Sequence, residues 1–310
     1  MIRFNTLLIL IFVHFFFACA GGDSIKKKPE HFLSGMKEIK KGSIWYNKGC
    51  YKRSLEHFFK AHERFAESDR LIGVAMSLNN IGNIYRIAGD ISTALLFFDE
   101  SFDIYTDIRE YKESVKVLSN KAAALIDGGM LEEAEKVLNM AENIDWKDKK
   151  PLGSILNNQG ILLIKKKKFI NAEVVLKKSI AITEAENFSE FATANFVLGN
   201  LMLETKNYKQ AVNFFESALE ADRKTGFHKG IADDLAAIGS AYVSLGKTKY
   251  AVNFFKRSIK IYALLGETEN VHETMEQLEK ESKKTGMNIS LTTYFVKQWL
   301  EGKMLEDPCQ

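Results

Sequence analysis

The chain is poor in proline and has no marked excess of either charge. Its 310 residues include three prolines, so long stretches are free to form helix. The formal net charge is +3 at pH 7, which gives no overall electrostatic reason to expect a nucleic-acid partner. Hydrophobic residues make up 46% of the chain and charged residues 27%, proportions that are typical of folded rather than disordered protein.

The chain also lacks a convergent set of catalytic or metal-binding groups. His57 and His62 are five positions apart, which does not place both side chains on one helix face. Residues 246–248 read Gly-Lys-Thr, as in a phosphate-binding loop, but the glycine required five positions earlier is Ala241. No paired cysteines suggest zinc and no Gly-x-Ser-x-Gly suggests a serine nucleophile. We therefore expect no enzymatic activity, no cofactor and no metal.

The first residues have a different composition from the rest. Arg3 precedes an apolar run from Leu7 to Ala18, which is short for a membrane span and typical of a signal peptide. The run ends in Ala18-Cys19, which resembles the lipobox of bacterial lipoproteins, where the cysteine is lipidated and becomes the new N-terminus. The resemblance implies a signal peptide at 1–18, a lipid on Cys19 and a cell-envelope location, periplasmic or on the cell surface. An ordinary cleaved signal and a short uncleaved anchor are the alternatives.

Small residues recur along the chain with a period of roughly 40 residues. Each repeat has three small positions at a constant spacing, and all eighteen positions hold glycine, alanine or serine, which identifies an internal repeat. The first position holds Gly42, Gly82, Ala122, Gly160, Gly199 and Gly239, the second Ser54, Ala94, Ala134, Ala172, Ala211 and Ala251, and the third Ala61, Ser101, Ala141, Ser179, Ala218 and Ser258.

Large apolar residues keep register with the small ones. One stands three positions after the first small residue, as in Tyr85, and another stands four positions after the second, as in Phe98. Spacings of three, four and seven predict helices, and a glycine such as Gly89 suits the turn between them. Two antiparallel helices can approach closely where a small residue on one faces a large residue on the other. A single helix pair cannot bury its whole apolar face, so each pair stacks on the next one. The sequence therefore predicts an all-α protein.

This order of small residue, aromatic, glycine turn, Ala, Phe and Ala resembles the tetratricopeptide repeat (TPR). Residues 79–98 are similar to the longer repeats of kinesin light chain and of the Leu-Gly-Asn polarity adaptors. The resemblance implies a right-handed α-solenoid of about six helix pairs over 35–266, with repeats that start near 35, 75, 115, 153, 192 and 232. A tether at 19–34 would precede it. Helices at 267–304 would cap it, followed by a tail at 305–310, although the last helix could instead fold into the groove or onto another subunit.

In TPR proteins the first helix of each pair lines the concave surface. Asparagine suits such a groove because its amide offers both a donor and an acceptor to an extended peptide backbone. Arg86 could bind a carboxylate of a partner in two-pronged geometry. The alternative is that these side chains are ordinary polar residues on an open helix face. The groove positions that the resemblance implies are Met76, Asn79, Asn83, Arg86, Asn157, Ile161, Asn200 and Leu203.

Taken together, these expectations predict a non-catalytic adaptor that is held on the cell envelope through an N-terminal lipid and binds a protein or peptide. One alternative is a TPR protein that senses a peptide or another small ligand. A second alternative is a ligand-binding lipoprotein that works with a transporter.

Two cysteines remain, Cys50 and Cys309, and they lie near opposite ends of the chain. A disulfide needs Cα atoms within roughly 7 Å of each other. Because the ends of a solenoid stay apart, we expect no disulfide between them.

Overall fold

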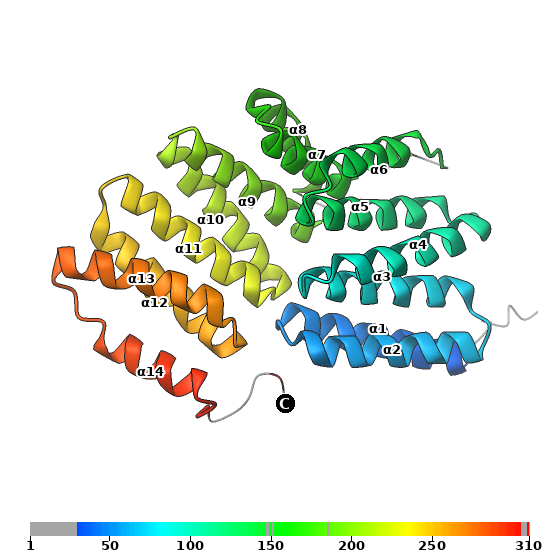
Figure 1. The fold of residues 1–310 in the computed structure, drawn as a ribbon, viewed down its shortest axis with the longest axis horizontal. Helices are drawn as coiled ribbons and strands as arrows, with labels where there is room; N and C mark the ends of the chain where they lie inside the picture. Colours follow the sequence, from blue (N-terminus) through cyan, green and yellow to red (C-terminus); the bar gives the residue numbers. More distant parts are fainter. Residues whose placement is uncertain (1–29, 147–148, 151, 185–186, 305–308, 310) are drawn as a thin grey trace, which may run out of the picture.

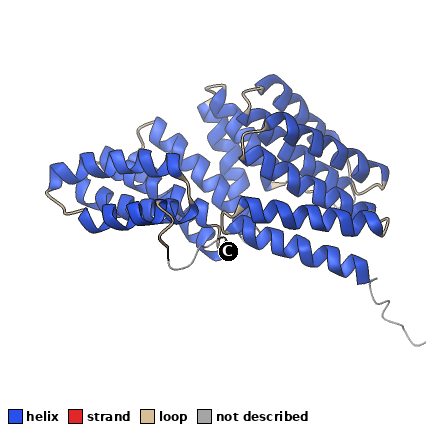
Figure 2. Cartoon of the chain, turned by 60° about the horizontal axis from the view of Figure 1, so that its bottom comes forward, coloured by secondary structure: helices blue, strands red, loops and turns tan. Residues whose placement is uncertain are grey.

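The computed structural model describes residues 30–146, 149–150, 152–184, 187–304 and 309. Within these ranges every regular element is an α-helix, which confirms the expected all-α class (Figures 1 and 2). The signal peptide, Cys19 and most of the tether lie outside the described residues. The helices are α1 (Glu30–Asn47), α2 (Tyr51–Glu67), α3 (Leu71–Ile87), α4 (Ile91–Asp107), α5 (Tyr111–Asp127), α6 (Leu131–Asn143), α7 (Gly153–Lys165), α8 (Phe169–Thr183), α9 (Phe188–Glu204), α10 (Tyr208–Thr225), α11 (His228–Ser244), α12 (Thr248–Leu265), α13 (Thr268–Thr285) and α14 (Ser290–Leu300).

The small residues of the repeat allow the two helices of each pair to approach closely. A Cβ added to Gly82 would lie 2.7 Å from the ring of Phe98, and one added to Gly199 would lie 2.6 Å from the ring of Phe215. Both rings are fully buried. The large residue of the second helix therefore fills the space that the glycine of the first helix leaves open.

Serine at the third small position has a reason beyond its size. In three repeats its hydroxyl is buried and donates a hydrogen bond to a backbone carbonyl of the first helix of the same pair. This bond satisfies the polar atom and joins the two helices. The pairs are Ser101 with Ala75 (2.8 Å), Ser179 with Gly153 (3.2 Å) and Ser258 with Ala232 (2.7 Å).

The solenoid curls until its first helix pair reaches the sixth (Figure 1). The ring of Tyr46, at the end of α1, stacks on Phe227 just before α11, with ring centroids 6.1 Å apart. Next to this contact, the amide of Asn47 donates to the carbonyl of Thr225 at 3.2 Å. Gly49 faces the side chain of Leu265, at the end of α12. The chain therefore forms a nearly closed ring rather than an open stack.

The expectation that Cys50 and Cys309 stay apart is wrong. The two residues form a disulfide, and their Cα atoms are 5.3 Å apart. The expectation treated the repeats as a straight stack. The small rotation from each pair to the next accumulates over six pairs and returns the chain to its start. Cys50, at the turn between α1 and α2, thereby comes within reach of the C-terminal tail.

The last two helices pack onto the sixth pair. Val271 and Leu278 of α13 and Val296 of α14 are buried in one cluster with Phe255 and Ile259 of α12. The loop before α14 is also fixed, because Lys256 donates to the carbonyl of Asn288 at 2.6 Å. Within the described ranges, no helix is both long enough and apolar enough to cross a membrane.

Candidate functional site

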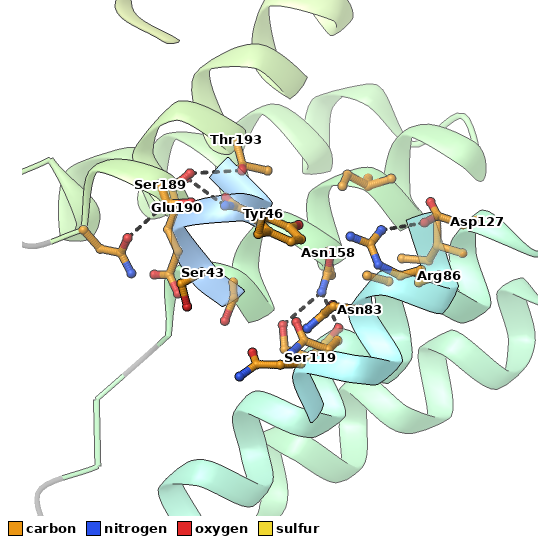
Figure 3. A pocket seen from close by; sticks show the side chains of 18 of the residues that line it. Ser43, Tyr46, Asn83, Arg86, Ser119, Asp127, Asn158, Ser189, Glu190 and Thr193 are labelled. Carbon is orange, nitrogen blue, oxygen red and sulfur yellow. Dashed lines mark hydrogen bonds and ion pairs between the residues drawn. The ribbon is translucent and has the colours of Figure 1, made fainter. Parts of the chain in front are cut away.

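A cavity of about 520 Å³ lies on the concave face, where α1 meets α3, α5, α7 and the start of α9 (Figure 3). Seven of its twenty lining residues are asparagines, so amide groups dominate its chemistry. Tyr46, from the point where the ring closes, forms part of its wall. The asparagines are Asn47, Asn80, Asn83, Asn120, Asn157, Asn158 and Asn187.

Several of these amides hold neighbouring repeats together. Asn158 of α7 donates to the backbone carbonyl of Ser119 on α5 at 2.7 Å and to its hydroxyl at 3.0 Å. Asn120 of α5 donates to the amide oxygen of Asn79 on α3 at 2.9 Å. Asn157 donates to the carbonyl of Glu190 on α9 at 2.9 Å. The inner face is therefore a hydrogen-bonded ladder that runs across four repeats.

Opposite charges lie at different places on the cavity wall (Figure 3). Arg86 of α3 pairs with Asp127 of α5 at 2.6 Å, and its Nε atom is buried with no hydrogen-bond partner among the described residues. Glu190 lines another part of the wall, where burial raises the pKa of its carboxyl although a hydrogen bond with Ser154 opposes the shift. Burial also raises the pKa of the Tyr46 phenol, which therefore stays a neutral hydrogen-bonding group. A ligand thus meets a guanidinium, amides and a carboxyl.

The structure brings four of the eight groove positions to the cavity: Asn83, Arg86, Asn157 and Ile161. Asn79 accepts the hydrogen bond from Asn120, which lines the cavity. Met76 and Leu203 are half-buried against core clusters. Asn200 is exposed and does not line the cavity.

Other lining residues were not among the expected positions. Asn80, Asn120 and Asn158 stand two positions before the first small residue of three successive repeats, a regularity that the sequence contains. Tyr46 and Asn187 carry no such signal, because they reach the cavity only through the curvature of the solenoid and the loop before α9.

Comparison with known proteins agrees with the repeat pattern. Residues 74–108 and 189–263 each match a family model described as tetratricopeptide repeat. The chain contains tetratricopeptide repeats. None of the curated proteins matches its sequence.

Solved structures share the fold of this chain at low sequence identity. One is a Rap protein complexed with competence and sporulation factor: 17% identity, TM-score 0.57, covering 84% of this chain and 78% of that chain. Another is the Rap conjugation gene regulator of plasmid pLS20 in complex with the Phr* peptide: 16% identity, TM-score 0.58, covering 94% and 83%. A third is BtubC from P. vanneervenii: 16% identity, TM-score 0.51, covering 74% and 91%. At these identities the likeness shows the fold alone.

Proposed function

We propose that this protein is a non-catalytic TPR scaffold that binds a short peptide, free or part of a larger partner, in the cavity on its concave face. The observation that carries the proposal is the asparagine-lined cavity of about 520 Å³ enclosed by four repeats and the closing residue Tyr46. An extended peptide exposes alternating N–H and C=O groups along its backbone, and an asparagine amide can bind either kind. The volume lies within the range of sites for small ligands rather than for a folded partner.

Two features of the molecule and one comparison support a peptide as the ligand. Asn80 and Asn83 face the cavity, and neither side chain takes part in the bonds described between repeats; the Asn83 amide donates to the carbonyl of Asn79 one turn earlier in its own helix, at 3.2 Å. Arg86, although paired with Asp127, keeps a buried Nε atom with no hydrogen-bond partner among the described residues, and Glu190 places a carboxyl on another part of the wall, so both donors and acceptors are available to a peptide. The Rap regulator of plasmid pLS20, which shares the fold, was solved in complex with the Phr* peptide.

A synthetic hexapeptide library tests the proposal directly. The purified full chain is immobilised, the library is passed over it, and retained peptides are sequenced by mass spectrometry and resynthesised. We expect a family of related peptides that bind with measurable heat in titration calorimetry. A retained pool with the same composition as the input library would refute peptide binding.

We further propose that the protein is anchored on the cell envelope through a lipid on Cys19. The apolar run and the Ala18-Cys19 pair support the lipid, and the disulfide between Cys50 and Cys309 fits export, because disulfides persist in oxidising compartments. Labelling with a palmitate analogue should mark the wild type and not Cys19→Ala. The matched control Cys309→Ser should keep the label. A label that survives in Cys19→Ala would remove the lipid from the proposal.

A further inference from the structure

A second cavity, of about 120 Å³, lies between α9, α10 and α11 and is acidic. Asp222, Asp233 and Asp234 all line it, and we call it the acidic pocket. Ser189 and Thr193 of α9 line both the acidic pocket and the larger cavity. The two cavities are therefore neighbours that share a wall.

The three carboxyls of the acidic pocket are not equivalent. Asp233 has partners within the chain: Lys229 lies 2.9 Å and 3.2 Å from its two oxygens, and the hydroxyl of Tyr262 donates to it at 2.6 Å. Asp234 is 1% exposed, and its Oδ2 atom is buried with no hydrogen-bond partner among the described residues. A buried acceptor without a donor is costly, so this atom indicates a donor that comes from outside the chain.

Asp222 sits tightly against the first turn of α11. A Cβ added to Gly230 would lie 1.8 Å from its Oδ2 atom, so this carboxyl occupies the space that any larger residue at position 230 would fill. Asp222 is 7% exposed and lines the same pocket as Asp234. The pocket is therefore built around two buried carboxyls, and Lys229 pairs with Asp233 rather than with either of them.

Part of the remaining wall is apolar. Ala192, Phe196 and Phe227 form this part, beside the hydroxyl-bearing Ser189 and Thr193, and Phe227 is the ring on which Tyr46 stacks where the solenoid closes. Among the described residues, no group of three or more His, Cys, Asp or Glu side chains is arranged to hold a metal ion. Aromatic and methyl surface beside two carboxyls instead suits an alkylammonium, whose methylenes pack on the rings and whose three N–H groups donate to the oxygens.

We propose that the acidic pocket binds a primary ammonium group of the peptide held in the larger cavity, with Asp222 and Asp234 as its acceptors. This inference rests on the proposed peptide-binding function and specifies the chemistry of the ligand. A lysine side chain and a free N-terminal amine both present this group, and the experiment below separates them.

The electrostatics of the acidic pocket agree with this geometry. Burial raises the pKa of Asp222 to about 7 and that of Asp234 to about 9, with neighbouring carboxylates contributing. Arg223 acts in the opposite direction on Asp234, while Lys229 is engaged by Asp233. Near neutral pH these carboxyls therefore retain protons, and an ammonium group would take their place.

Three hexapeptide libraries of otherwise equal composition test the proposal on the full chain. One is N-acetylated with lysine fixed at one position, one has a free N-terminus with norleucine at that position, and one is N-acetylated with norleucine. We expect the wild type to retain the first or the second at least tenfold more strongly than the third, and which of the two is retained identifies the source of the ammonium group. Asp234→Asn and Asp222→Asn should reduce that preference about 10- to 100-fold, because a hydrogen bond to a charged group is replaced by one to a neutral amide.

The matched control is Asp103→Asn, which changes an exposed carboxyl on the outer helix α4 and should leave the preference unchanged. Thermal melts confirm that each variant folds. Equal retention of all three libraries by the wild type overturns the ammonium site and leaves peptide binding intact. A preference that survives in Asp234→Asn and Asp222→Asn also overturns it, whereas retention of none of the libraries overturns peptide binding and the ammonium site together.

Discussion

The inner faces of repeats two to four and of repeats five and six use the same helix positions for different purposes. The positions three and two before the first small residue are polar in the earlier repeats and apolar in the later ones. Phe196, for example, packs its ring 5.6 Å from that of Phe215 in the core of the fifth repeat. The residues are Asn79 and Asn80, Ser119 and Asn120, and Asn157 and Asn158 in the earlier repeats, against Phe196 and Val197, and Ala236 and Ala237, in the later ones.

This difference separates what the fold requires from what the site requires. Both regions keep the small residues and the large residues that face them, because every helix pair needs them. Amides are not needed for stacking, since repeats five and six stack without them. The amide ladder bonds neighbouring repeats, and we propose that the amides of the cavity also bind the ligand and that the acidic pocket of the later repeats recognises its charge.

The largest effect should follow from removing ligand contacts in the amide-lined region. Changing Asn83 and Arg86 together to alanine should weaken binding of a selected hexapeptide about 10- to 1,000-fold, because neutral hydrogen bonds contribute about 1 kcal/mol each and charged ones about 1.5 to 3. Titration calorimetry measures the change. Glu100→Ala with Asp103→Ala, on the exposed face of α4, is the control and should leave affinity unchanged. If the α4 variant loses binding while the groove variant keeps it, recognition belongs to the outer face.

Removing the disulfide tests how much it contributes to holding the first repeat against the C-terminal end of the solenoid. It joins the turn of the first repeat to the C-terminal tail across 259 residues of sequence, and such a crosslink restricts the unfolded chain. Cys309→Ser should lower the free energy of unfolding by about 2–4 kcal/mol. Urea unfolding without reductant measures the loss, and adding reductant to the wild type should produce the same loss. Equal midpoints for wild type and variant without reductant would show that the stack of Tyr46 on Phe227 and the Asn47 bond suffice.

Asn158 tests the structural part of the amide ladder. Its alanine variant removes two buried hydrogen bonds to Ser119 on the neighbouring repeat, so the free energy of unfolding should fall by about 1–3 kcal/mol. Asn80 occupies the same register position one helix pair before Asn120, and none of the ladder bonds described above uses its side chain. Asn80→Ala should therefore change stability by less than about 0.5 kcal/mol. Similar losses in both variants, measured by urea unfolding, would mean that the ladder bonds do not stabilise the stack.

The helix pairs could be predicted from the sequence because their determinants lie within one repeat. Gly82 and Phe98 belong to the same helix pair, are in contact, and recur at equivalent positions in the other copies. Asn83, Arg86, Asn157 and Ile161 line the cavity because of the helix face that each occupies, and their role in binding stays a prediction. Features of this kind can be predicted from the sequence because they depend only on residues that are close together within one helix pair.

The closure of the ring could not be predicted in this way. The contact of Tyr46 with Phe227 and the disulfide depend on the sum of six small rotations, and no single residue sets that sum. The acidic pocket has the same origin. Asp222 and Asp234 are separated by a turn, and the burial of both carboxyls depends on how α9, α10 and α11 pack together.

The smallest effect should come from the acidic pocket in the absence of ligand. Burial raises the pKa of Asp234 to about 9, far above its value of about 3.9 in an unfolded chain. The folded protein therefore binds more protons than the unfolded chain between about pH 4 and 9, so the stability associated with this group is complete at the acidic end and falls as pH rises through this range. The charged groups around it are Asp222, Asp233 and Arg223, which the variant leaves in place.

Asp234→Asn keeps the shape of the side chain and removes its titration. Its melting temperature should approach that of the wild type at pH 4 to 5 and exceed it by about 2–6 °C at pH 9, because a buried carboxylate without a partner costs about 1–3 kcal/mol. Melts followed by circular dichroism at pH 5, 7 and 9 measure the difference. Asp103→Asn, an exposed carboxyl of α4, should follow the wild type at each pH. If the melting temperatures of Asp234→Asn and the wild type differ by the same amount at every pH in this range, Asp234 has an ordinary pKa. The later repeats would then lack a pocket that holds protons, and this contrast with the amide-lined repeats would not exist.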